Sequence, residues 1–450
     1  MIRLARALRV TDYFTLGWGT MVGVGWLVVM DDWLSRGGPL GAILGFAVGG
    51  ALLLPIGYVY GQLVMSMPDA AGEIAYTAKV FSQFVSFATG WMMVLAYFIV
   101  CPWEAVAVGR IASYIFPALD SIELYRVAGK PVYLPHLVIG LGLTALLTVL
   151  NYRGIRLSAT FQNWTAFGTL ALFVVFVSFG AAHGSPKNFS PLFGSNSVIV
   201  SIFLVMQIVP YFMTGFESVA KAAEEASPEF RAGGFFKAIM MAIVVGILFY
   251  TVVIAAVAYA APWKTLTSEK FMTAVAFQRA VGSRWIVNVI LAAALLSLFK
   301  VFNGNFVAAS RLVFALGRRG LVDRRFATVH PLNHTPSTSV IWVGLATATC
   351  MFLGQAILVP VSEVGSVASA IGWTAACAAY YAMRPARNQQ LVAALGAFLG
   401  LMMILMKIVP ALPGHFSGYE WLALAIWGAV GLGLNWREKL VSLQKVANTD

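Results

Sequence analysis

Charged residues are scarce in this sequence. Asp, Glu, Lys and Arg make up 11% of its 450 residues, whereas 60% are hydrophobic. About a quarter of the residues are charged in a typical soluble domain, so the composition excludes an ordinary soluble protein. Apolar runs of about twenty residues recur along the whole chain, and each is long enough to cross a hydrocarbon core of ~30 Å. The sequence therefore predicts an all-α polytopic membrane protein.

Cysteine and histidine are also rare. The 3 cysteines, Cys101, Cys350 and Cys377, lie inside apolar runs and predict no disulfide framework. The 5 histidines lie in or near loops without metal-ligand spacing, so we expect neither a metal nor a cofactor. No nucleophile–base pair or phosphate-binding loop indicates an enzyme.

The net charge of +12 does not indicate a nucleic-acid partner. The basic residues gather in short loops between the apolar runs, which is how membrane proteins fix their orientation. Lys and Arg are more numerous in the loops on the side of the N-terminus. We therefore expect both termini in the cytoplasm, and the compact loops favour a prokaryotic inner membrane.

Twelve apolar spans are expected, separated by breaks that contain glycine or proline. They cover residues 12–35, 39–66, 81–116, 133–152, 155–182, 198–225, 235–261, 285–316, 337–355, 361–383, 390–410 and 419–436.

The first and the sixth span each contain an interruption. Residues 17–25 read Gly-Trp-Gly-Thr-Met-Val-Gly-Val-Gly, and glycine inside a helix costs about 1 kcal/mol relative to alanine. In the sixth span, Pro210 precedes the run Met-Thr-Gly-Phe-Glu at residues 213–217. Interruptions in corresponding helices of two five-helix sets predict an inverted repeat with a substrate site at the midplane. The alternative is that these glycines only allow close helix packing.

Several segments resemble the amino acid–polyamine–organocation (APC) permeases, which share the LeuT-type inverted-repeat fold. Residues 20–25 look like the family's first-helix Gly-x-Gly signature, with Val24 in place of a small polar residue. Residues 211–225 are similar to its unwound sixth helix. Residues 309–336 resemble its helix-eight exit and the following loop, and residues 151–162 its fourth-to-fifth helix joint.

The resemblance implies alternating access around a central site. It implies two inverted five-helix repeats, residues 1–182 and 183–383, and two further helices with a cytoplasmic tail in residues 384–450. Because residues 117–132 contain no cysteine, no disulfide-linked heavy subunit is expected. The expected partners are a small-molecule substrate and membrane lipid.

The resemblance also implies which residues bind the substrate. Backbone N–H groups would receive a carboxylate, backbone carbonyls would receive an ammonium group, Tyr211 would be an aromatic gate, and Phe302 a side-chain contact. The N–H groups belong to Val22, Gly23, Val24 and Gly25, and the carbonyl segments contain Met21 and Tyr211, Phe212, Thr214 and Gly215.

Ionisable residues at membrane depth are costly and are functional hypotheses by default. Lys300 lies near the middle of the span 285–316, too deep to reach the interface. Sodium-coupled relatives place hydroxyl ligands for an ion in this region, so Lys300 would fill an emptied sodium site. Other relatives place a lysine on helix five, where this chain has Thr169. The alternative for Lys300 is a static ion pair with Glu104.

Three other acidic positions stand out. Glu104 would bind the amine of a cationic substrate or relay protons, or it would pair with Lys300 or Arg110. Glu217 begins the second half of the sixth span, where a structural role and proton sensing are both open. Asp31 and Asp32 would either attract cations to the entrance of the substrate site or lie at a solvated helix end without a functional role.

These features predict a secondary transporter of amino acids or related amines that is independent of sodium and is proton-coupled or an exchanger. One alternative is a cationic amine or polyamine transporter that uses Glu104. Another, of a different class, is a membrane nutrient sensor that does not transport.

Overall fold

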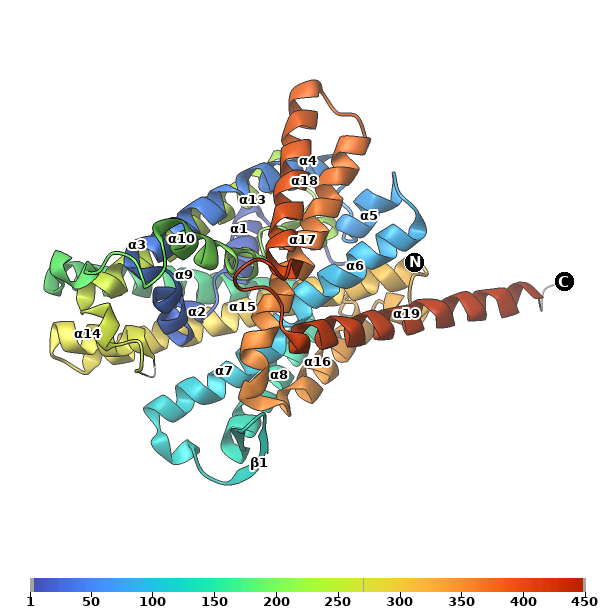
Figure 1. Ribbon diagram of the computed structural model, residues 1–450. Coiled ribbons are helices and arrows are strands. Elements are labelled where there is room, and N and C mark those ends of the chain that lie inside the picture. The colour runs from blue at the N-terminus through green and yellow to red at the C-terminus, as the bar shows by residue number, and fades with distance from the viewer. Residues whose placement is uncertain (1–3, 270, 448–450) are drawn as a thin grey trace.

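The computed structural model describes residues 4–269 and 271–447, and nearly all of its regular structure is helical (Figure 1). Within these residues, 7 helical stretches are long and apolar enough to cross a membrane. They are Met30–Ser66, Gln83–Ile115, Leu134–Arg153, Ile155–His183, Gly233–Ala260, Trp285–Arg318 and Arg387–Ile408. The expected all-α polytopic membrane protein is confirmed.

The N-terminal part of the chain holds the first five expected spans. The first span is divided among three helices, and the second and third each combine two. The elements are α1 (Val10–Met21), α2 (Gly25–Val28), α3 (Met30–Ala51), α4 (Leu54–Ser66), α5 (Glu73–Ala78), α6 (Gln83–Phe98), α7 (Val100–Ile115), β1 (Glu123–Val127), β2 (Lys130–Tyr133), α8 (Leu134–Arg153) and α9 (Ile155–His183).

The remaining spans follow in order. The sixth span is divided among three helices, and each later span has one principal helix. The elements are α10 (Val198–Met206), α11 (Val209–Met213), α12 (Ser218–Lys221), α13 (Gly233–Ala260), α14 (Met272–Val281), α15 (Trp285–Arg318), α16 (Ser337–Met351), α17 (Leu358–Ala382), α18 (Arg387–Ile408) and α19 (Gly418–Ala447).

Two features of the loops were not expected from the sequence. The segment after α7 forms an antiparallel hairpin of β1 and β2, and α14 is a short helix between α13 and α15. The hairpin turns at Ala128 and Gly129, whose φ angles are 48° and 77°. Two successive positive φ angles suit the right-handed twist of the flanking strands, so the turn fixes the hairpin.

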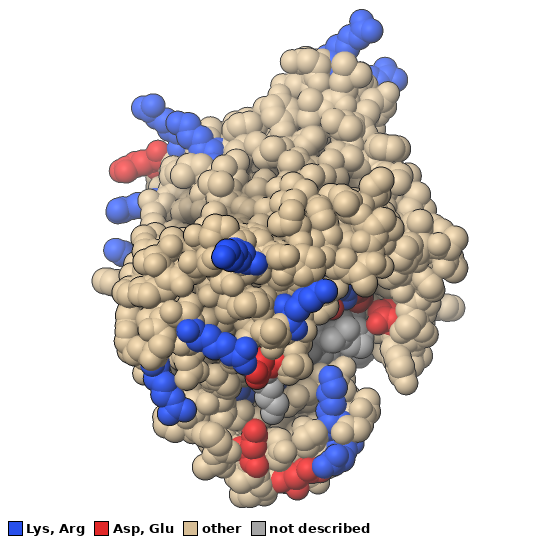
Figure 2. All heavy atoms as spheres, turned by 60° about the vertical axis from the view of Figure 1, so that its left-hand side comes forward, with Lys and Arg blue, Asp and Glu red and all other residues tan. Residues whose placement is uncertain are grey.

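The loops divide between two ends of the molecule. In Figure 1 the N-terminus and the last residues of α19 lie to the right, whereas α14 lies far to the left and the hairpin lies at the bottom. Figure 2 shows a wide uncharged surface with charged side chains gathered in patches toward its margins and lower part. This distribution is the one expected of a protein with a lipid-facing belt.

Helix α15 is the centre of the bundle. It contacts α1, α6, α7 and α9, and its residues from Lys300 to Gly317 are all buried. Asn303 on α15 accepts hydrogen bonds from Asn151 (3.0 Å) and Ser158 (3.1 Å), and it donates to Gln162 (3.0 Å). This buried network joins the α8–α9 junction to α15, as satisfied polar groups can in a membrane.

Two buried ion pairs hold the end of the sixth span, one to α15 and the other to α5. Arg311 Nη2 lies 3.0 Å from Glu225 Oε1, and both side chains have no exposed surface. Lys221 Nζ lies 2.5 Å from Glu73 Oε1, again with neither side chain exposed. A buried charge without its partner is strongly destabilising, so each pair fixes the position of two elements.

Replacing Arg311 with Met would leave the Glu225 carboxylate buried without a partner. We expect a loss of about 3–5 kcal/mol of folding free energy and a clearly lower Tm in detergent. The matched control is Arg126→Met, which removes the exposed Arg126–Glu123 pair of the hairpin and should leave the Tm nearly unchanged. Equal melting temperatures for the two variants would contradict the role given to the buried pair.

Candidate functional site

The first expected span is interrupted where its glycines cluster. Helix α1 ends at Met21, and the chain passes through Val22 (φ −95°, ψ 97°) before α2 begins at Gly25. The predicted interruption is therefore confirmed. Carbonyl groups that a continuous helix would pair are released here, and at membrane depth they need other donors.

Two side chains of α15 reach the released carbonyls. The Ser297 hydroxyl lies 3.1 Å from the Val22 oxygen and 2.9 Å from the Gly23 oxygen. The Lys300 ammonium donates to the Val22 oxygen and to Ser297 Oγ (3.2 Å), and it lies 4.7 Å from the centre of the Trp18 ring. Lys300 has no exposed surface, so its positive charge is held by the oxygens of the α1 interruption and an aromatic face.

Two further side chains complete this coordination. Asn305 Nδ2 donates to the Thr20 oxygen at 3.1 Å, and the Tyr250 hydroxyl donates to the Met21 oxygen at 3.2 Å. The carbonyls of residues 20–23 thus all have protein partners, which makes the irregular backbone tolerable inside the membrane.

The sixth span is interrupted opposite the first. Helix α11 ends at Met213 and α12 begins at Ser218. Gly215 has φ 142°, and a Cβ atom added to it would lie 2.6 Å from the backbone nitrogen of Met21. The two interruptions therefore pack backbone against backbone, and only glycine fits at Gly215.

Glu217 stabilises the second interruption. Its Oε2 atom accepts a hydrogen bond from the Gly215 N–H at 3.1 Å, while Lys221 Nζ donates to the Glu217 carbonyl at 3.1 Å. Glu217 is not among the cavity residues. Of the two roles left open by the sequence, these contacts favour the structural one.

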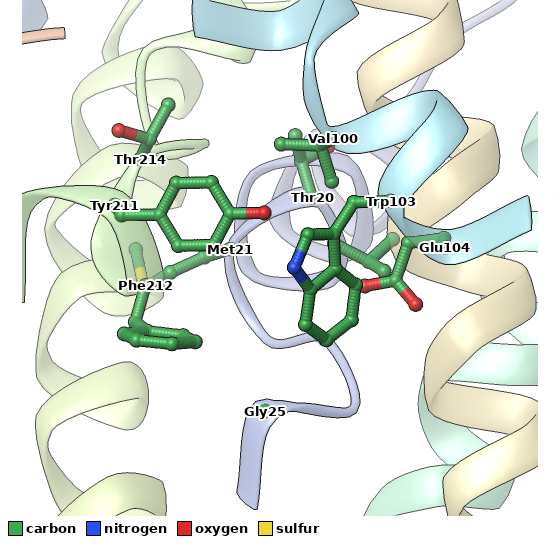
Figure 3. Close-up of a pocket in the computed structure, with 11 residues that line it drawn as sticks. Thr20, Met21, Gly25, Val100, Trp103, Glu104, Tyr211, Phe212 and Thr214 are labelled. Atoms are coloured by element: carbon green, nitrogen blue, oxygen red, sulfur yellow. The ribbon is translucent and has the colours of Figure 1, made fainter. Parts of the chain in front are cut away.

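A small cavity lies between the two interruptions and α7 (Figure 3). The cavity volume is about 20 Å³, which is room for about one water molecule and far below the ~300 Å³ of a small ligand site. The lining residues are Thr20, Met21, Gly23, Gly25, Val100, Trp103, Glu104, Tyr211, Phe212, Thr214 and Val301. The walls of the cavity must therefore separate before an organic solute binds between them.

Most of the residues predicted to bind substrate line this cavity or lie beside it. Val22, Val24 and Gly215 belong to the adjacent interruptions but are not lining residues. Phe302 does not reach the cavity: it is fully buried, with its ring 6.4 Å from that of Phe306. Lys300 is not a lining residue either, and its ammonium is bonded to the Val22 carbonyl.

Four lining residues were not singled out from the sequence, namely Thr20, Val100, Trp103 and Val301. Helical spacing offers a signal for two of them, because Val100 lies three residues before Trp103 and four before Glu104, on one face of α7. Figure 3 shows the Trp103 ring between Tyr211 and Glu104.

Glu104 does not form either of the ion pairs considered for it. Among the described residues, no ion pair within 4.0 Å joins it to Lys300 or to Arg110. Its carboxylate instead lies against the α1 interruption, where a Cβ atom added to Gly23 would lie 2.7 Å from Glu104 Oε1. The pairing was the alternative that charge alone suggested for both residues, but the Lys300 ammonium bonds a released carbonyl instead.

At the outer end of α2 and α3, one of the two acidic residues is paired. Asp32 accepts from Arg36 Nε at 2.8 Å, and Arg36 also lies 3.6 Å from Glu363. Asp31 and Asp32 are partly exposed and do not line the cavity.

A membrane helix bundle with two facing helix interruptions around a small cavity has the architecture of a solute transporter. The amino acid permease family model matches residues 8–432. This chain belongs to the amino acid permease family, within the APC superfamily. It is a membrane transporter of amino acids or related substrates, and not an enzyme.

The chain is similar to several curated transporters over most of its length. It is 26% identical to the methylthioribose transporter of Bacillus subtilis, covering 95% of this chain and 92% of that protein. It is 25% identical to the branched-chain amino acid permease BcaP of the same organism, over 81% of this chain and 77% of the relative. The aromatic amino acid transport protein AroP of Escherichia coli is 23% identical, with 98% of each chain covered.

Replacing Gly215 with Ala would force a Cβ atom against the Met21 nitrogen at a positive φ angle. We expect a loss of more than about 1 kcal/mol of stability and weaker ligand binding, because the two interruptions must move apart. Thermal unfolding in detergent measures the first effect. The control is Gly142→Ala on α8, where an added Cβ meets nothing within 4 Å. An unchanged Tm in Gly215→Ala would show that the contact is dispensable.

Proposed function

We propose that this chain is a secondary active transporter of a small amino acid or related amine, working by alternating access. The substrate binds in the cavity between the α1 and α11–α12 interruptions. The relatives are named as transporters of methylthioribose, of branched-chain amino acids and of aromatic amino acids, which supports a small organic substrate. The paired interruptions and the short loop helices α5 and α14 support two inverted repeats in residues 1–182 and 183–383.

We further propose that transport is independent of sodium. The observation that carries this proposal is the contact of the Lys300 ammonium with the Val22 carbonyl and the Ser297 hydroxyl. A carbonyl and a hydroxyl are ligands that a small hard cation would use, and the fixed ammonium already supplies the positive charge. No lysine occurs on α9, and Thr169 bonds within that helix to the Thr165 carbonyl at 2.8 Å. Energy coupling then comes from protons or from exchange.

Specific observations distinguish the two alternatives, a transporter of cationic amines and a sensor. A polyamine or cationic amine substrate is favoured by the Glu104 carboxylate on the cavity wall. A sensor that binds without transporting would be stabilised by its ligand but would give no flux into sealed vesicles.

Uptake into proteoliposomes should proceed equally well in sodium and in choline buffers. Lys300→Met should reduce uptake by about tenfold or more, because the Val22 carbonyl loses a charged partner worth about 1.5–3 kcal/mol. Lys407→Met is the control: Lys407 is equally deep in the protein but pairs with Glu363 away from the cavity. A wild-type protein that requires sodium for uptake would disprove the proposal.

The N- and C-termini are proposed to lie in the cytoplasm, with the hairpin outside. In a variant whose Cys350 is replaced by Ala, an added cysteine at Lys130 should react with an impermeant maleimide in intact cells. A cysteine at Glu229, in the loop before α13, should react only after permeabilisation. Both positions are exposed. The opposite labelling pattern would invert the orientation.

A further inference from the structure

Glu104 occupies the place where a substrate carboxylate would be expected. The resemblance to the APC permeases implies that backbone N–H groups of residues 22–25 receive that carboxylate. In this chain the Val22 N–H already donates to the Trp18 oxygen at 3.0 Å. A Cβ atom added to Gly23 would lie 2.7 Å from Glu104 Oε1, so this oxygen lies directly on the α1 interruption.

A second side chain lies at the same segment. The Tyr250 hydroxyl of α13 donates to the Met21 oxygen at 3.2 Å. A carboxylate from α7 and a hydroxyl from α13 therefore already occupy the surroundings of the backbone at which the resemblance places a substrate carboxylate.

Two polar atoms at the cavity have no hydrogen-bond partner among the residues that the structure describes. They are Glu104 Oε2 and the Tyr211 hydroxyl, and both are buried. Both residues line the cavity, and the Tyr211 hydroxyl points across it toward α7 (Figure 3). Buried polar atoms are rarely left unsatisfied, so these two mark where a ligand completes the bonding. A carboxylate oxygen accepts hydrogen bonds, so its missing partner is a donor.

We propose that the substrate of this chain has no carboxylate and donates a hydrogen bond to Glu104 from an ammonium or hydroxyl group. This inference rests on the proposed function and specifies its substrate class. Glu104 acts as a built-in carboxylate: it lies against the backbone of Gly23 and repels a second anion in the closed cavity. Like charges brought together away from water are unfavourable, and selectivity arises as much from this repulsion as from attraction.

The test compares compounds that differ by a carboxylate. The pairs are L-leucine with 3-methylbutylamine, L-phenylalanine with phenethylamine, and L-lysine with cadaverine; methylthioribose serves as a neutral hydroxyl compound. Thermal-shift titration of the full-length protein gives the affinities, and competition against uptake in proteoliposomes confirms them. We expect a carboxylate-free compound to bind about tenfold or more tightly than its amino acid. Binding of an amine indicates that the donor is an ammonium group, and binding of methylthioribose indicates that it is a hydroxyl group.

Glu104→Gln should reduce this preference at least several-fold, by weakening amine binding and admitting amino acids. Tyr211→Phe is the second variant, and it should weaken binding of the carboxylate-free ligand while leaving the preference over its amino acid in place. Glu363→Gln is the control; it removes a partly buried carboxylate outside the cavity and should not alter the preference.

Amino acids that bind as tightly as their amines in the wild-type protein would overturn the inference and leave the transporter proposal intact. The inference would also be overturned if none of the carboxylate-free compounds stabilised the protein. A ligand that binds but gives no flux would overturn the proposed function instead. The two failures are therefore distinguishable.

Discussion

The need to satisfy released carbonyl groups inside a membrane governs the centre of this protein. Interrupting α1 exposes backbone oxygens at a depth where water does not pair them. Ser297 and Lys300 of α15 meet the oxygen of Val22, and Tyr250 of α13 meets that of Met21. The interruption is therefore held by two helices on different sides. A buried lysine, which would be costly in isolation, becomes part of the backbone hydrogen bonding.

The second constraint is steric. Gly215 brings the sixth span against Met21, and Gly23 lets the Glu104 carboxylate reach the same segment. Both contacts leave no room for a side chain. Glycine lowers helix stability at these positions, but it permits an approach of backbone and carboxylate that no other residue allows. The cavity is consequently bounded on one side by backbone rather than by mobile side chains.

The sequence predicted the existence of these features better than their contacts. Glycine spacing in residues 17–25 and Pro210 predicted both interruptions, because helix propensity is a local property. The directions of Lys300 and Glu104 depend on which faces of α15 and α7 meet the α1 interruption, which is set by packing across the bundle. Charge alone therefore suggested an ion pair that is not formed. The hairpin was missed because its turn depends on the positive φ angle of Ala128, which composition does not indicate.

The geometry also separates two buried charges. Lys300 is bonded to the Val22 carbonyl and is not a cavity residue, whereas Glu104 lines the cavity. The two side chains thus contact adjacent residues of the α1 interruption, Val22 and Gly23, without forming an ion pair within 4.0 Å among the described residues. Under the proposed function, a ligand that bonds Glu104 would draw its carboxylate away from the Gly23 backbone, next to the Val22 carbonyl that Lys300 holds. Binding in the cavity and the Lys300 contact would then be connected through the conformation of two adjacent residues, a path short enough for one to bias the other.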